Sequence, residues 1–245
     1  MIKAITNKLG RFLLPFLVTA ATAASADVTR QEVEKSLEKG IDFYSKLDKT
    51  KNWNTPGGFT WSYSLDLKQR WGRQDLGEES TRATAQEPAT PTVGLAFLDA
   101  YKATGNKKYL ELAERAGDAL ILGQLKDGGW NHEIDYTGEV QKTARAEFKE
   151  GKIQVPIQYL MQLFQETGNK KYDLSARKGL EFMLNAQFKE GAWPLTFPLT
   201  SRKMLPNPNW EAPEGFEFLE NNISFNDGGS STCMETMLIA YQFYK

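Results

Sequence analysis

Apolar residues recur every three to four positions in four segments of the chain, which is the spacing of amphipathic helices. In residues 90–104, for example, Val93, Phe97 and Ala100 fall on one stripe. The same spacing occurs in three further segments, at residues 108–125, 155–167 and 171–188. A short polar turn separates the first segment from the second and the third from the fourth. The pattern therefore predicts two helical hairpins.

The two hairpins are copies of one sequence unit. Residues 101–131 (YKATGNKKYLELAERAGDALILGQLKDGGWN) align with residues 164–194 (FQETGNKKYDLSARKGLEFMLNAQFKEGAWP) at a constant offset of 63. The string TGNKKY is identical in both, and its glycines, Gly105 and Gly168, are natural left-handed helix C-caps. A tetratricopeptide array would repeat about every 34 residues. The longer unit favours an α/α toroid, in which inner and outer helices alternate.

Partial units flank these hairpins. Residues 28–47 resemble the second helix of a hairpin, and residues 230–245 resemble the first helix of a third. The predicted fold class is therefore all-α: an incomplete α/α toroid of repeated helical hairpins with long loops on one rim. The uncovered faces of the first and last helices predict self-association. Composition suggests one domain, residues 27–245.

Residues 1–26 have the pattern of a signal peptide. Lys3, Lys8 and Arg11 form a positive region, residues 12–18 form an apolar core, and Ala24-Ser25-Ala26 fits a cleavage site. We expect cleavage after Ala26, which makes the mature protein secreted or periplasmic. No later segment has about 18 uninterrupted apolar residues, so we expect no membrane association after cleavage.

Charge and composition exclude several functional classes. The formal net charge is -1 and becomes about -4 without the signal peptide, which argues against a nucleic-acid partner. Cys233 is the only cysteine, so no intramolecular disulfide is expected, and we predict a buried apolar role for it. His132 is the only histidine, which disfavours catalytic triads and zinc sites.

Aromatic and basic residues of the predicted rim loops are candidates for substrate binding. Aromatic faces suit a carbohydrate platform, because sugar rings present apolar C–H faces. Trp130 and Trp193 recur at the same repeat position; they either bind a sugar or close the hairpin ends as core residues. Other rim aromatics include Phe59, Trp61 and Tyr63. In the long loop 199–222, Arg202 and Lys203 either meet an anionic ligand or form a solvated surface pair.

Several strings in combination carry a family resemblance. They are the repeated TGNKKY turn, LNAQFKEGAWPLTFPL, a proline-rich loop and NNISFNDGGSSTCMETMLIAY. Together they resemble the pectate lyases of polysaccharide lyase family ten. The resemblance implies an α/α toroid, a calcium cofactor and an acidic polysaccharide partner, polygalacturonate (pectin), cleaved by β-elimination.

The resemblance also implies site residues. Asp227 is the leading calcium ligand, and Asn226 shapes its loop or binds substrate; as an alternative, Asp227 caps the following helix. Glu150, in FKEGKIQ, is the acid at the offset where the family has an acidic segment, and it has lysine neighbours. The family's base is an arginine from a later hairpin. No arginine here matches that position, so the catalytic residues are left unassigned.

Two other functions stay open. The first is a non-catalytic, truncated toroid that binds pectin or oligouronides, because the lysines beside Glu150 and the unmatched arginine depart from the family. The second is a glycoside hydrolase on the same fold, which needs two carboxylates across a cleft. Glu133 and Asp135 are its candidates by position alone.

Overall fold

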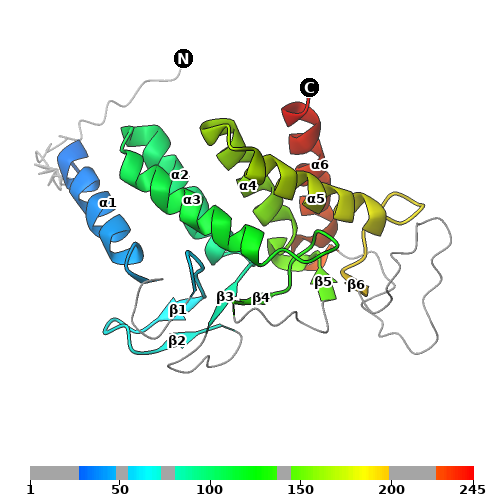
Figure 1. Ribbon diagram of the computed structural model, residues 1–245, viewed down its shortest axis with the longest axis horizontal. Coiled ribbons are helices and arrows are strands. Elements are labelled where there is room, and N and C mark those ends of the chain that lie inside the picture. Colours follow the sequence, from blue (N-terminus) through cyan, green and yellow to red (C-terminus); the bar gives the residue numbers. More distant parts are fainter. Residues whose placement is uncertain (1–27, 48–54, 73–80, 137–144, 199–224) are drawn as a thin grey trace, which may run out of the picture. The chain divides into compact units, whose positions relative to one another are not determined.

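A computed structural model describes residues 28–47, 55–72, 81–136, 145–198 and 225–245. The predicted signal peptide and all of the long loop 199–222 lie outside these residues. The chain divides into two compact units, residues 1–38 and 39–245. Figure 1 shows six helices in the described residues: α1 (Arg30–Tyr44), α2 (Thr90–Thr104), α3 (Lys107–Leu122), α4 (Gln154–Thr167), α5 (Lys170–Ala186) and α6 (Gly229–Phe243).

Helices α2 and α3 form one hairpin and α4 and α5 form the other, as the repeat predicts. Each hairpin turns at a glycine with a positive φ, 71° at Gly105 and 67° at Gly168. The next residue, Asn106 or Asn169, then caps the second helix, its side chain accepting a hydrogen bond from the main-chain N–H two residues on. The identical TGNKKY strings therefore encode identical turns.

Short antiparallel strands close the opposite end of each hairpin, where the sequence predicted only polar loops. Strand β3 (Arg82–Thr84), before α2, pairs with β4 (Glu133–Asp135), after α3. Strand β5 (Arg145–Glu147) pairs in the same way with β6 (Thr196–Pro198) around the second hairpin. Both pairs obey the offset of 63, since 145 follows 82 by that number. The repeat therefore includes a strand before and after each hairpin.

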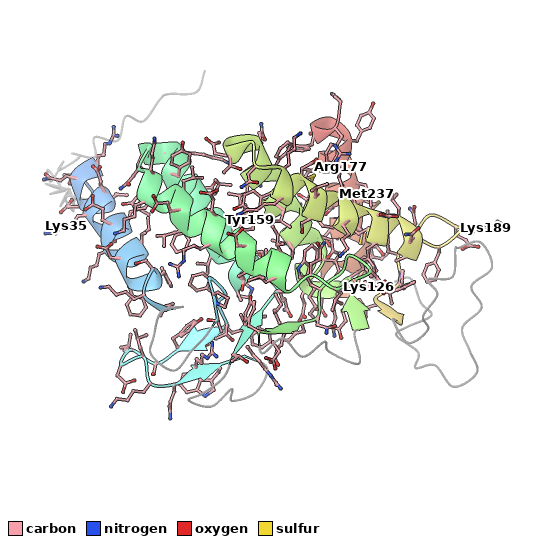
Figure 2. The ribbon with its side chains drawn as sticks, viewed as in Figure 1. Lys35, Lys126, Tyr159, Arg177, Lys189 and Met237 are labelled. Atoms are coloured by element: carbon pink, nitrogen blue, oxygen red, sulfur yellow. The ribbon has the colours of Figure 1, made fainter. Side chains whose placement is uncertain are left out.

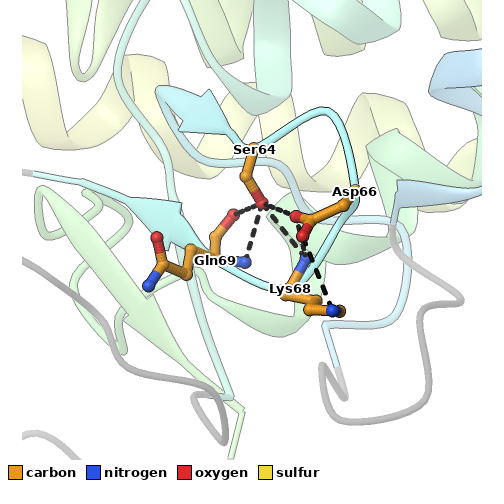
Figure 3. Close-up of polar contacts among 4 residues, drawn as sticks. All are labelled: Ser64, Asp66, Lys68 and Gln69. Carbon is orange, nitrogen blue, oxygen red and sulfur yellow. Dashed lines mark hydrogen bonds and ion pairs between the residues drawn. The ribbon is translucent and has the colours of Figure 1, made fainter.

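A third strand pair, β1 (Ser62–Tyr63) with β2 (Arg70–Trp71), precedes the hairpins. Its connecting turn is held by Ser64, whose Oγ donates to Asp66 Oδ1 at 2.7 Å and accepts from the Gln69 N–H at 2.9 Å (Figure 3). The hydrogen bond from Ser64 and the one from the main-chain N–H of Lys68 stabilise the charged carboxylate and lower the pKa of Asp66. The turn is thus ordered by its own polar side chains.

The core lies between the two hairpins. Tyr159 of α4 is fully buried, and its hydroxyl donates to the carbonyl of Ala113 in α3 (Figure 2). Its ring lies against Gly94 of α2, where a Cβ would come within 2.4 Å of the ring. Any larger residue at position 94 would push the hairpins apart. Helix α4 also contacts α6, so it is central to the second unit.

Neighbouring sequence units meet through glycine turns. A Cβ at Gly57 would lie 2.1 Å from the carbonyl oxygen of Arg115, and one at Gly128 would lie 2.2 Å from that of Lys178. Lys178 follows Arg115 by 63 residues, so successive glycine turns approach equivalent points of successive helices. With its two helical hairpins and their equivalent turns, the described chain confirms the predicted fold class.

Candidate functional site

The indoles of Trp130 and Trp193 are buried, at 0% and 5% exposure. Trp130 Nε1 donates to the carbonyl oxygen of Leu120 at 2.7 Å, and Trp193 Nε1 donates to that of Met183 at 2.9 Å. Each indole therefore closes the end of the helix before it. This burial is the geometry of the core alternative, and it leaves neither ring face open for a sugar to stack on.

Trp61 is the rim indole that stays open. It is 37% exposed, and its ring makes an edge contact with His132, with 5.2 Å between centroids. Phe59, two residues earlier, is buried against Phe97. The GGFTW string therefore places Phe59 in the core and Trp61 on the surface.

Glu133 and Asp135 lie on one strand and share a partner. Arg82, opposite them in β3, contacts both carboxylates at 3.4 Å. Thr81 Oγ1 also donates to Asp135 at 2.7 Å. Since residues two apart on a strand face the same side, the two acids stand side by side. They do not form the facing pair that a glycoside hydrolase requires.

The turn that carries Glu150 lies directly after β5. Residues Lys149–Gly151 form a 3₁₀ turn, η2, in which Glu150 has a left-handed backbone with φ of 55°. The preceding Phe148 is fully buried, and its N–H donates to the carbonyl of Leu195 at 2.8 Å. The hydrophobic anchor at Phe148 therefore fixes the turn to the strand pair at the open end of the second hairpin.

A buried lysine lies between two carboxylates at this turn. The side chain of Lys152 is 1% exposed; its Nζ donates to Glu147 Oε2 and lies 3.2 Å from Glu150 Oε2. Lys149 Nζ lies 3.9 Å from the same oxygen of Glu147. A buried ammonium is tolerated only when it is paired in this way. The sequence suggested lysines beside Glu150, but not that one of them is buried against it.

Asp227 occupies a second left-handed turn that contacts the first. Residues Asn226–Gly228 form the 3₁₀ turn η3, with φ of 49° at Asp227, and η3 packs against η2. The structure thus brings together the turns of both predicted metal ligands. A left-handed backbone at two non-glycine residues is an uncommon strain that concentrates at functional sites. The side chain of Asn226 lies outside the described residues, as do Arg202 and Lys203.

Asp227 is not the residue that caps the following helix, which was the alternative role predicted for it. Helix α6 has Gly228 as its N-cap residue, with φ of 72° and no side-chain cap. Inside the first turn, Thr232 Oγ1 donates to the Gly228 carbonyl at 2.7 Å. Asp227 precedes the cap by one residue, and its side chain is exposed.

Gln154 fastens the two turns together. Its fully buried side-chain amide donates to the Phe148 carbonyl at 2.6 Å and to Thr232 Oγ1 at 3.0 Å. It also contacts the thiol of Cys233, which is free and buried as the sequence predicts. Burial raises the pKa of that thiol to about 12, which excludes a reactive thiolate at neutral pH. Gln154 was not identified from the sequence, because a polar residue at the start of a helix is normally expected to be exposed to solvent.

The arrangement of the described acids bears on the predicted calcium cofactor. Calcium takes about six to eight oxygen ligands, whereas the described residues contain no group of three or more His, Cys, Asp or Glu arranged to hold a metal. The carboxylates of Glu147 and Glu150 instead contact the ammonium of Lys152. Within the part of the chain that the structure describes, no helix is both long and apolar enough to cross a membrane.

Comparison with solved structures identifies proteins that are similar to this chain. A sugar epimerase from a ruminal bacterium has a TM-score of 0.50 at 17% identity, covering 68% of this chain and 40% of that one. A family 10 polysaccharide lyase from Cellvibrio cellulosa has a TM-score of 0.44 at 20% identity, covering 70% of this chain and 57% of that one. A mutant of the Cellvibrio lyase in complex with trigalaturonic acid also has a TM-score of 0.44 at 20% identity, covering 67% and 55%. The chain therefore spans little more than half the length of these lyase chains.

The sequence was also compared with curated proteins and with models of protein families. A search of curated proteins finds no significant match. The family model described as Pectic acid lyase matches residues 131–243. That segment contains both the Glu150 turn and the Asp227 turn, together with the helices α4, α5 and α6 that hold them. Residues 131–243 are therefore similar to the pectic acid lyase family, which confirms the resemblance seen in the sequence.

Proposed function

We propose that this protein is exported, binds polygalacturonate and cleaves it by β-elimination, as a pectate lyase-like enzyme. The observation that carries the proposal is the family match over residues 131–243, the segment in which the turns of Glu150 and Asp227 pack together. This packing supports a shared role for two turns that are 77 residues apart, since 227 follows 150 by that number.

The chemistry of the substrate defines what the site has to supply. The C5 proton of a galacturonate is α to a carboxylate and is too weakly acidic to leave unaided at neutral pH. A positive charge near that carboxylate would stabilise the negative charge that develops, and a base would take the proton as the C4 oxygen leaves. We assign no base among the described residues. Calcium stays a prediction from the resemblance.

Trp61 is the rim residue best suited to hold a sugar ring. Its indole is partly exposed on the chain that leads into β1, and the edge of His132 limits its movement. An indole of fixed orientation loses little entropy when it stacks on a ligand. We expect Trp61→Ala to weaken oligogalacturonate binding about tenfold, whereas Trp130→Phe leaves the affinity of the folded protein unchanged.

The activity test uses the purified chain with polygalacturonate, in buffer with calcium and in buffer with a chelator. The expected result is a rise in ultraviolet absorbance from unsaturated uronate ends. Release of saturated reducing ends would instead indicate hydrolysis. If neither product forms while a family lyase assayed in parallel is active, the catalytic proposal fails for this chain.

A second candidate function is binding without catalysis. It is favoured by the ion pairs of Lys152, which engage both acids nearest the predicted metal position. Calorimetry with oligogalacturonates would then show binding without any unsaturated product. Absence of a binding heat would remove this candidate.

Export is proposed from the first 26 residues. Expression in a bacterial host with a fractionation step, followed by amino-terminal sequencing, should give a mature chain that begins at Asp27. Protein retained in the cytoplasm with Met1 intact would contradict the proposal.

A further inference from the structure

Ion pairs link the Glu150 turn to the end of β5. Lys152 is buried and contacts Glu147 and Glu150, while the partly exposed Lys149 lies near Glu147. Two ammonium groups thus face two carboxylates. Glu87 approaches the same turn, since a Cβ on Gly151 would lie 3.5 Å from its Oε2.

The first repeat shows that this corner of the fold does not need the Glu147–Lys152 ion pair. At the offset of 63, Glu147 corresponds to Thr84 and Lys152 corresponds to Ala89. Both residues are buried, and the strand pair and helix there form in the same way. Glu150, in contrast, corresponds to Glu87. The Glu147–Lys152 pair is therefore particular to the second repeat, the one that contacts the Asp227 turn.

A metal ion and this ammonium would compete for the same oxygens. Calcium binds carboxylate oxygens at about 2.3–2.6 Å, and the Oε2 atoms of Glu147 and Glu150 both lie against Lys152 Nζ. Like charges held this close in a buried site repel strongly, because little water screens them. Lys152 has no room to withdraw, since its side chain is enclosed.

We infer that the ammonium of Lys152 takes the place of a metal ion at the Glu147 and Glu150 carboxylates, so that η2 is held against β5 by a built-in cation and is independent of calcium. The inference does not rest on lyase activity; it holds equally for a binding protein. It also makes a specific claim about the resemblance, namely that this part of the implied metal site is replaced by a residue of the chain itself.

The experiment titrates calcium chloride into the purified chain by calorimetry and follows thermal unfolding in calcium and in chelator. For the unaltered protein we expect the same Tm in both buffers and no calcium binding that depends on Glu150. Lys152→Met removes the ammonium and keeps most of the apolar stem. We expect this variant to bind calcium at least tenfold more tightly and to unfold at a higher temperature in calcium than in chelator.

Three variants serve as controls. Lys149→Met removes the partly exposed neighbour and should gain no calcium binding. Glu147→Thr with Lys152→Ala copies the neutral pair of the first repeat, and should fold without responding to calcium. Glu150→Gln should lower the Tm equally in both buffers, because it removes a partner of Lys152; this variant keeps the test decisive if Lys152→Met does not fold.

Calcium binding by the unaltered protein that Glu150→Gln abolishes would overturn the inference. So would a folded Lys152→Met variant that gains no affinity, or a loss of stability in Glu150→Gln that occurs only in calcium.

Discussion

Trp130 and Trp193 make the same hydrogen bond, each from Nε1 to the carbonyl oxygen ten residues earlier in the chain. The two indoles hold the last turns of α3 and α5. Phe in place of Trp193 would leave the Met183 carbonyl without this donor, at a cost of about 1–3 kcal/mol. Chemical denaturation should show this loss for Trp193→Phe and for Trp130→Phe.

Trp61→Phe is the matched control. Because the indole of Trp61 is partly exposed, this substitution should change the free energy of unfolding by less than about 0.5 kcal/mol. Equal stability of the Trp193→Phe variant and the unaltered protein would contradict the structural role assigned to the buried indoles.

The asparagine caps give a second prediction. Asn106 and Asn169 accept hydrogen bonds from the N–H groups of Lys108 and Lys171 at 3.1 and 3.3 Å. Replacing either cap with Ala should reduce the free energy of unfolding by about 1 kcal/mol, because an end donor of the helix loses its partner. Asn185→Ala, on the exposed surface of α5, should be nearly neutral. A loss at Asn185 as large as at the caps would refute the assignment.

Cys233 predicts a dependence of stability on pH. Burial raises the pKa of its thiol from 9.0 to about 12, so between these values the unfolded state binds fewer protons than the folded state. Stability is then fully present below about pH 9 and is lost as pH rises. From pH 9 to 10 the loss should be about 1 kcal/mol by this linkage.

The measurement is urea denaturation of the unaltered protein and of Cys233→Ala. The variant is expected to be less stable at pH 7, because it removes a buried sulfur, but to lack this part of the alkaline loss. Parallel pH profiles for the two proteins between pH 9 and 10 would show that the thiol ionises normally.

Helix α6 predicts self-association. Met234, Leu238 and Tyr241 lie at helical spacing on its outer side and are 56%, 56% and 72% exposed. Such an apolar stripe favours contact with another surface. Sedimentation should give a mass above that of one chain, and Leu238→Asp should shift the distribution to monomer. A monomeric mass for the unaltered protein at high concentration would remove the prediction.

Much of the helical fold was predictable, because the sequence repeat shows that the same helical hairpin occurs twice. Gly105, Gly168 and the periodic apolar residues fix both hairpins locally, and a local signal can be read from sequence alone. Strand β3 was not predictable in this way. Its partner β4 lies about 50 residues later, and each strand is too short to show a period of its own.

The candidate site was predictable in its location but not in its chemistry. The family strings identified Glu150 and Asp227, and the two turns do meet. No pattern showed that Trp130 and Trp193 point inward. A tryptophan after two small residues is compatible both with a surface that binds a sugar ring and with a core residue that closes the end of a hairpin. Nor did FKEGKIQ show which lysine is buried, because η2 interrupts the helical period between Phe148 and Lys152.

The glycine turns also bear on how such a chain changes in length. Gly128 meets Lys178 just as Gly57 meets Arg115, through main-chain atoms that do not depend on side-chain identity. A junction of this kind accepts any following unit that keeps its helix backbone in place. Duplication or removal of one whole 63-residue unit would therefore preserve the fit between neighbours, whereas a single added methyl group at Gly128 would destroy it.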